Sequence, residues 1–311
     1  MTIKSGLSLY SSRLAVVSFL LLTLPVSVAA VENVPQFPQA SFKSLEIVDL
    51  PSSGPRWQVD ATRVRVMMER NGQVAYMDDL KMRLFGEGGR NFLISAEQGI
   101  LNIDEGKMKA KGRILVTTPQ NAGGEDSQKD QSRMLLKGGE VWADLNEQKV
   151  IVSGGITTEQ RDPGGKLFAV TALSGEIDFK SYELRYFGKA EATLDSVQSR
   201  SREMRIQLDE KNFSIKSASA LGNVELKYVE ATQERKKFFA RCARALFSQE
   251  PGSSLLDGKV ILEGAPYLFM DGDRMEGERI SMWLSNQRVL VEQAKAKVKP
   301  NFRNVSGDLN G

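Results

Sequence analysis

The sequence predicts an all-β protein, an elongated antiparallel β-jelly roll made of stacked strand pairs. Apolar and charged residues alternate in many short segments, as side chains do on the two faces of a strand. Glycines recur at a nearly constant spacing within these segments, which is typical of stacked supersecondary units. Short stretches such as RNGQ, NIDEG, RDPGGK and QEPGSS supply the Gly, Pro, Asn and Asp that reverse the chain between strands.

The segment KMKAKGRILVTT, residues 107–118, shows the alternation most clearly. Met108, Ile114 and Val116 fall on one parity, while four basic residues fall on the other. This pattern predicts a strand with one buried and one solvated face. Gly112 shares the apolar parity in mid-strand, where glycine marks a bend or a close approach by another group. We therefore expect it to leave room on the buried face.

Five other glycines occupy the same place in similar segments. The glycines of this predicted inner row are Gly86, Gly112, Gly154, Gly188, Gly222 and Gly258. Gly154, Gly188 and Gly222 are 34 residues apart. The longer step before Gly154 contains PQNAGGEDSQKDQ, which reads as a polar surface loop. An alternative is that inner glycines simply ease the twist of the sheet.

The same alternation predicts which apolar side chains point inward. The inward candidates are Ile94, Met108, Ile114, Val116, Val152, Ile156, Val170, Ile206, Val224, Val260 and Ile280. The segment 231–247 has mixed apolar spacing that could suit a helix. We interpret it as a turn followed by a strand, with Phe239, Ala243, Ala245 and Phe247 on one face.

The first 30 residues have the pattern of an export leader. Lys4 and Arg13 precede the uncharged stretch 14–31, and Val28 and Ala30 supply the small residues of a cleavage site. Retention as a membrane anchor is the alternative, because the stretch approaches the ~20 residues that span a bilayer. Residues 31–56 then read as a tether. Lys and Arg total 42 against 39 Asp and Glu, a balance that does not favour nucleic acid as a partner.

The residue inventory argues against enzymatic chemistry. The chain has no histidine, which removes Ser-His-Asp and Cys-His catalysis and the commonest zinc ligand. The carboxylate pairs Asp78–Asp79 and Asp271–Asp273 are expected in turns rather than at a metal. Cys242, the single cysteine, is expected to be a small buried residue, with a reactive thiol as the alternative. We predict no metal and no cofactor, although a glycan-cleaving β-solenoid that uses carboxylates remains open.

Three stretches resemble the OstA-like lipopolysaccharide-export proteins, which include the LptC and LptA families. RWQVDATRVRVMME and FLISAEQGILNIDEGKMKAKGRILVTT resemble the start of an LptC-like domain, through Trp57, Ala61, Ala96–Gly99 and Gly112–Val116. LLDGKVILEGAPYLFMDGDRMEGERISMWLSNQRVLVE resembles an LptA-like repeat. The resemblance covers roughly residues 45–299 and rests on degenerate patterns. The chain is longer than one such domain, and its leader looks cleavable where LptC-like proteins keep an anchor.

The resemblance implies a domain order and a periplasmic function. It implies an LptC-like domain over 57–195, an LptA-like domain over 196–300 and a polar tail over 301–311. The implied function is lipopolysaccharide transport through an open β-jelly roll, whose inner apolar residues and glycines contact lipid. Exposing an acyl chain of about a dozen carbons to water has a free-energy cost of roughly 10 kcal/mol, at ~0.8 kcal/mol per CH₂.

The implied partners are other jelly-roll export proteins, added at sheet edges, and an inner-membrane ABC transporter. The alternative is a structural or adhesive β-repeat protein with a dry core, in which the inner residues only pack together.

Overall fold

The computed structural model describes most of the chain between residues 40 and 294. The described residues are 40–49, 51, 56–69, 72–85, 91–118, 133–161, 167–194, 196–210, 213–228, 238–249, 257–270, 272–286 and 288–294. The predicted leader, the start of the tether, Gly86, the polar loop 119–131 and the tail 301–311 lie outside them.

The described residues form one antiparallel sheet of 17 strands. The strands are β1 (Ala40–Asp49), β2 (Trp57–Glu69), β3 (Gly72–Phe85), β4 (Asn91–Asn102), β5 (Lys107–Thr117), β6 (Arg133–Asp144), β7 (Lys149–Arg161), β8 (Leu167–Asp178), β9 (Glu183–Leu194), β10 (Val197–Leu208), β11 (Ile215–Tyr228), β12 (Phe238–Ser248), β13 (Lys259–Glu263), β14 (Tyr267–Met270), β15 (Asp273–Glu276), β16 (Arg279–Trp283) and β17 (Val289–Glu292). From β1 to β12 each strand pairs with its neighbours in the sequence. The predicted all-β antiparallel fold is confirmed.

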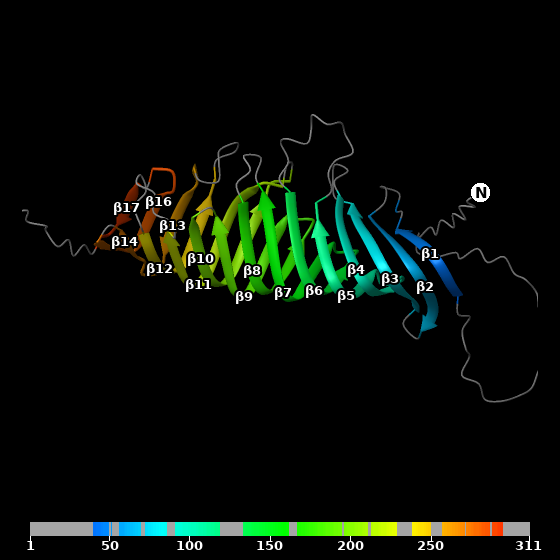
Figure 1. Cartoon of the computed structure of the whole chain (residues 1–311). Coiled ribbons are helices and arrows are strands. Elements are labelled where there is room, and N and C mark those ends of the chain that lie inside the picture. Colours follow the sequence, from blue (N-terminus) through cyan, green and yellow to red (C-terminus); the bar gives the residue numbers. More distant parts are fainter. Residues whose placement is uncertain are drawn as a thin grey trace, which may run out of the picture.

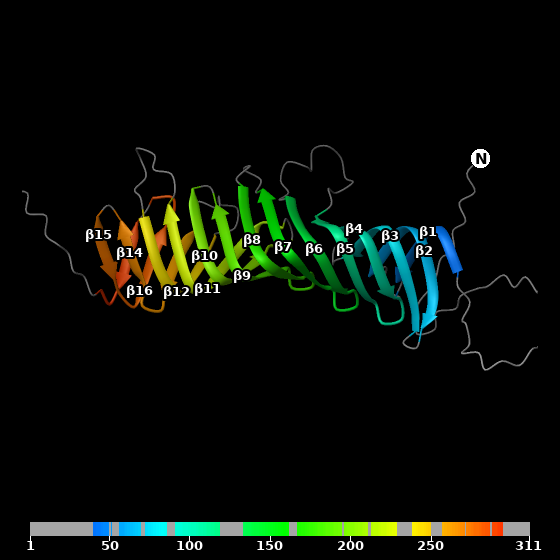
Figure 2. The same ribbon diagram turned by 60° about the horizontal axis from the view of Figure 1, so that its bottom comes forward.

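The strands stack along one long axis, with β1 at one end and β14 to β17 at the other (Figure 1). Turned by 60°, the sheet shows strands at two depths, so that it faces itself in two layers (Figure 2). We call one long border the turn rim, because residues 103–106, 145–148 and 179–182 join its strands in short turns. We call the opposite border the loop rim; there β3 is followed by β4, β5 by β6, β7 by β8, β9 by β10 and β11 by β12.

Each long strand bends near its middle, which allows the sheet to fold over. In β4, Phe92, Ile94 and Ala96 are buried, and the buried parity then switches to Gly99 and Leu101. The pairing register with β5 shifts at the same place. Apart from the β3–β4 pair, every neighbouring pair from β2 to β12 has a similar shift. Bulges of this kind bend a strand and increase its twist.

Four of the six predicted inner-row glycines lie in this bend and do not face the interior. Gly112, Gly154, Gly188 and Gly222 all have positive φ. A Cβ on Gly112 would lie 2.7 Å from the Cβ of the exposed Glu97, and a Cβ on Gly188 would meet the exposed Leu173. The prediction that these glycines widen the buried face is therefore wrong. They turn the strand where an L-residue would be strained.

Gly258 does not belong to the bend. It is buried immediately before β13, and its equivalent in the bend row is Gly264, with φ of 79°. The sequence spacing of 36 residues from Gly222 therefore selected the wrong glycine, because the bend position lies 42 residues on.

Gly154 and Gly155 provide a direct test of the bend. Both have positive φ, but a Cβ on Gly154 would lie 3.2 Å from the Gly139 Cα, whereas a Cβ on Gly155 meets nothing within 4 Å. We expect Gly154→Ala to be less stable than Gly155→Ala by about 1 kcal/mol, the lower end of overpacking effects. Urea unfolding of the two variants measures the difference. Equal midpoints would contradict the close approach of β6 and β7 at this point.

The sheet begins within the predicted tether and continues across the predicted domain boundary. Residues 40–49, assigned to the tether, form β1 and pair with β2 from Ala40 opposite Val66 to Asp49 opposite Trp57. The boundary between 195 and 196 falls between β9 and β10, which pair from Val197 opposite Leu194 onward. One hydrophobic core runs through both halves.

Candidate functional site

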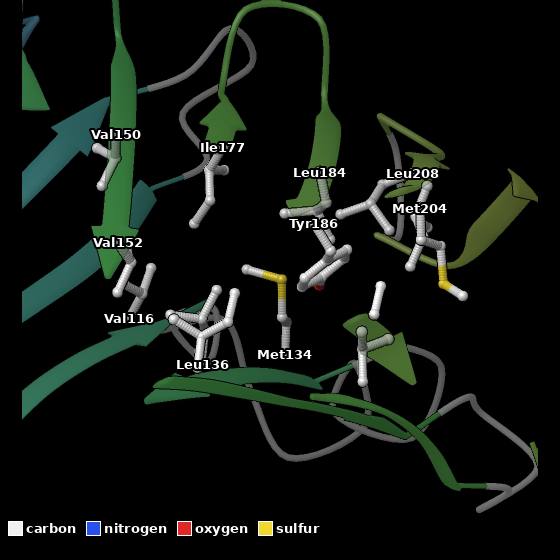
Figure 3. Close-up of a cluster of buried hydrophobic side chains, with 14 of the residues drawn as sticks. Val116, Met134, Leu136, Val150, Val152, Ile177, Leu184, Tyr186, Met204 and Leu208 are labelled. Atoms are coloured by element: carbon white, nitrogen blue, oxygen red, sulfur yellow. The ribbon is translucent and has the colours of Figure 1, made fainter. Parts of the chain in front are cut away.

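The inner faces of the two layers enclose one apolar core. All eleven predicted inward residues are buried, with exposed fractions of 7% or less. Figure 3 shows Met134 and Leu136 pointing from one layer toward Ile177, Leu184 and Tyr186 of the other. The inward orientation of the predicted row is thus confirmed, whereas its contact with lipid stays a prediction.

The two rims meet along a seam that side chains close in the N-terminal half. The Gln148 Nε2 on the turn rim donates a hydrogen bond to the Phe85 carbonyl oxygen on the loop rim at 3.1 Å. Gln160 at the loop rim donates likewise to the carbonyl oxygen of Phe213, and this bond is buried. Each contact joins a strand end on the loop rim to the start of the fourth strand further along. Both contacts therefore join the two rims with the same offset of four strands.

An aromatic cluster fills the interior beneath this seam. The ring centroids of Phe92 and Phe179 are 4.1 Å apart, and those of Phe92 and Phe213 are 5.1 Å apart in an edge-on arrangement. Tyr182 packs against Phe213 at 5.9 Å. Aromatic pairs at such distances add stability beyond the area they bury. Aromatic side chains therefore fill the interior at this point, where the resemblance implied an open furrow.

Further along, the seam widens into an apolar cleft of about 90 Å³. Phe168, Leu194 and Val197 of the loop rim face Phe247 and Val260 there. Ala192, Met204, Ile215, Ala218, Ala220, Leu226, Ala245, Leu246 and Leu284, with Ser199 and Ser219, complete the lining. Among the eleven predicted inward residues, only Val260 lines the cleft. Four alanines in the lining, on β9, β11 and β12, were the sequence signal that this stretch is less filled.

The cleft is small for a lipid tail in its observed form. An apolar cavity of ~150 Å³ accommodates benzene in another protein, so 90 Å³ admits only the start of an acyl chain. The Ser199 Oγ in its wall is buried and lacks a hydrogen-bond partner among the described residues. A polar atom near the head of an acyl chain would satisfy this hydroxyl, which otherwise destabilises the closed state.

The predicted carboxylate pairs do not belong to a larger cluster of metal-ligating residues in the described part of the chain. No cluster of three or more His, Cys, Asp or Glu residues occurs there. Asp78 and Asp79 lie in the bend of β3 rather than in the expected turn, and Arg63 pairs with them at 3.3 and 4.0 Å. Of the second pair, Asp271 lies outside the described residues and Asp273 begins β15. Burial raises the pKa of the Tyr186 phenol, so that the ring stays neutral in the core.

Cys242 is buried in β12, as the sequence predicts. Burial raises the pKa of its thiol to about 11 from an ordinary value of 9.0. Two pKa units correspond to about 100-fold less thiolate below pH 9, and thiolate is the reactive form. We expect iodoacetamide at pH 8 to modify Cys242 at least 100-fold more slowly in the folded protein than in urea. Equal rates would show that the thiol is accessible.

Comparison with known proteins finds likeness to solved structures at low sequence identity. No protein-family model and no curated protein matches the sequence. A solved structure of LptH from Pseudomonas aeruginosa, described as the LptA homologous periplasmic component of the lipopolysaccharide transport device, is 17% identical. The match covers 42% of this chain and 85% of that chain, with a TM-score of 0.35. At this TM-score the likeness supports no conclusion about function. Among the described residues, no helix has the length and apolarity to span a membrane.

Proposed function

We propose that the protein is a periplasmic lipid-binding component of lipopolysaccharide export, which shelters acyl chains in the apolar space between its two layers. The observation that carries the proposal is the cleft at the seam, whose lining is almost entirely apolar and whose sides belong to different layers. The resemblance of the sequence to the OstA-like proteins supplies the class of lipid. An apolar path avoids the free-energy cost of roughly 10 kcal/mol for exposing such a tail to water.

The geometry suggests how a tail would enter. The cleft continues the line of contacts made by Gln148 and Gln160, so widening the seam at the cleft enlarges the same interior space. No disulfide bond within the chain holds the two rims together, because Cys242 is its single cysteine. A lipid tail that separates the rims replaces side-chain contacts with its own, and no chemical step is needed.

The ends of the sheet provide docking edges for the proposed partners. Among the described residues, β1 pairs only with β2, and β17 pairs only with β16. A free edge presents unpaired backbone groups to which another strand can add. We propose that other jelly-roll export proteins add at these edges, with an inner-membrane ABC transporter at one end.

A photo-crosslinking amino acid tests the cleft directly. Placed at Val260 or Phe168, it should capture lipopolysaccharide in cells, whereas at Arg113 on the outer face it should capture none. Ile94, Ile114, Val152 and Ile206 were predicted lipid contacts; here we expect weaker capture, because the closed interior packs around them. Capture only at the outer position would contradict the proposal.

The filled interior beneath the seam favours a second function. The cluster of Phe92, Phe179 and Phe213 packs like an ordinary core, as a structural β-repeat protein with a dry core requires. Solvent extraction of the purified protein distinguishes the two functions. The lipid-binding function predicts acyl chains in the extract, and the structural function predicts none.

A further inference from the structure

A second hollow lies on the outer face of the sheet, far along the chain from the cleft. It has a volume of about 770 Å³ and lies over β2 to β7. One row of cross-strand neighbours forms its floor: Arg65, Tyr76, Ile100, Lys109, Trp142 and Ile151, each paired with the next. At the usual 4.7–4.9 Å between strands, the row is roughly 24 Å long. We call this surface the outer pocket.

The outer pocket exposes apolar and aromatic groups on a face that is otherwise solvated. Ile100 and Ile151 are 45% and 41% exposed, and Trp142 lies between them in register, beside Lys109. Tyr76 is held in place, because its hydroxyl donates to Glu69 Oε1 at 2.7 Å and the Arg65 guanidinium lies 5.3 Å from its ring. The Tyr76 ring is therefore held in a partly exposed position, where it can contact a ligand.

The charges of the pocket leave an excess of cations. Arg63, Arg65, Lys109 and Lys111 line it, against two carboxylates, Asp78 and Glu140. Asp78 is paired with Arg63 at 3.3 Å, and Glu140 lies opposite Lys111 across the strands. Arg65 and Lys109 remain in excess, and no described residue forms an ion pair with Lys109. An anionic ligand is the complement of this arrangement.

We propose that the outer pocket binds the phosphate headgroup of an anionic phospholipid at a membrane surface. Trp and Tyr prefer the interface between headgroups and acyl chains. Exposed isoleucines are also stabilised there, because their apolar surface leaves water. Each basic side chain near an anionic membrane adds about fivefold in affinity. A volume of 770 Å³ is within the usual ~300–1,000 Å³ of small-ligand sites, which suits one headgroup inserted into the hollow. This inference is independent of the proposed lipid cleft between β8 and β13.

Vesicle binding of the full exported chain tests the proposal. Trp142 becomes the reporter in the variant Trp57→Phe/Trp283→Phe, which leaves it as the single tryptophan. We expect sedimentation with phosphatidylglycerol-containing vesicles about tenfold above that with phosphatidylcholine alone, and a blue shift of Trp142 emission. Binding should weaken as salt rises, because surface charges are screened. Equal binding to both vesicles, or unchanged Trp142 emission, would overturn the proposal.

Two charge-reversal variants separate the pocket from net charge. Lys109→Glu/Lys111→Glu should lose binding to the anionic vesicles about tenfold or more. The control variant Lys81→Glu/Lys137→Glu makes the same change in charge on the outer face of the other layer. There Lys81 and Lys137 lie in one cross-strand row, with Ser95 and Leu115 between them. This variant should bind the vesicles as the parent does. Equal loss in both would show that only net charge matters. Soluble glycerol 3-phosphate that shifts Trp142 emission without vesicles would show a free phosphate-ester site and overturn the membrane assignment.

Discussion

Replacing Phe92 by alanine is expected to lower the free energy of unfolding by about 3–5 kcal/mol, the usual range for a buried phenylalanine. Phe92 is 2% exposed and its ring contacts Phe179 and Phe213, which belong to two different turns of the turn rim. The substitution therefore removes the contacts that hold the two layers together at the seam. Chemical denaturation followed by circular dichroism measures the loss.

Phe269→Ala is the matched control for this prediction. Phe269 lies in β14 and is 46% exposed, so the same loss of atoms should change stability by less than about 1 kcal/mol. If the two variants were equally stable, the aromatic cluster would not be closing the seam. Increased lipid capture at Ile94 in the Phe92→Ala protein would indicate that the cluster also separates the interior from the cleft.

Alternation was sufficient to predict many of the strands and the residues that they bury. Residues such as Met108, Ile114 and Val152 alternate with charged neighbours over a whole half-strand, and burial of one face is the strongest constraint on a strand. The pattern even identified 231–247 correctly as containing a strand, β12 (Phe238–Ser248). Its inward face was partly wrong, because Phe238, Ala240 and Cys242 are buried before the bend and Ala245 after it.

The bend itself could not be predicted from period-two alternation. In β4, β6, β8, β10 and β12 the buried parity switches at the bulge, while β5, β7, β9 and β11 keep it. In the latter strands positive φ occurs near the bend, as at Gly154 and Gly155. The mid-strand glycines therefore looked as if they pointed inward with the residues on either side. Their real signal was the recurrence of glycine pairs or Gly-Lys and Gly-Asn dipeptides, which are typical of left-handed backbone.

The seam was also beyond sequence pattern, because its contacts join residues 53 and 63 positions apart. A continuous row of inward residues is compatible with an open furrow or with a filled core. Which of the two forms depends on how closely the two rims approach each other. β1 was missed for a different reason: two prolines before it suggested a tether, yet Ile47 and Asp49 are buried against β2. The Asp49 carboxylate is paired with Arg56 at 2.6 Å.

Filling the cleft is expected to remove lipid from the protein while leaving the fold intact. Ala218 lines the cleft from β11, between Ile206 of β10 and Phe247 of β12. In Ala218→Phe, the added ring is of the same order of size as the 90 Å³ space. Acyl chains extracted from the purified variant should fall at least about tenfold. Overpacking lowers stability by about 1–3 kcal/mol, which a sheet with this large a core tolerates.

Ala169→Phe supplies the control for the cleft. Ala169 lies on the outer face of β8, between Glu159 and Thr193 of the neighbouring strands, next in sequence to the cleft residue Phe168. Because a phenyl ring there points away from the interior, this variant should retain the lipid content of the parent. Lipid retained by Ala218→Phe at the parent level would exclude the cleft as the binding site. Loss in both variants would instead point to a general loss of folding, which the melting curve of each would show.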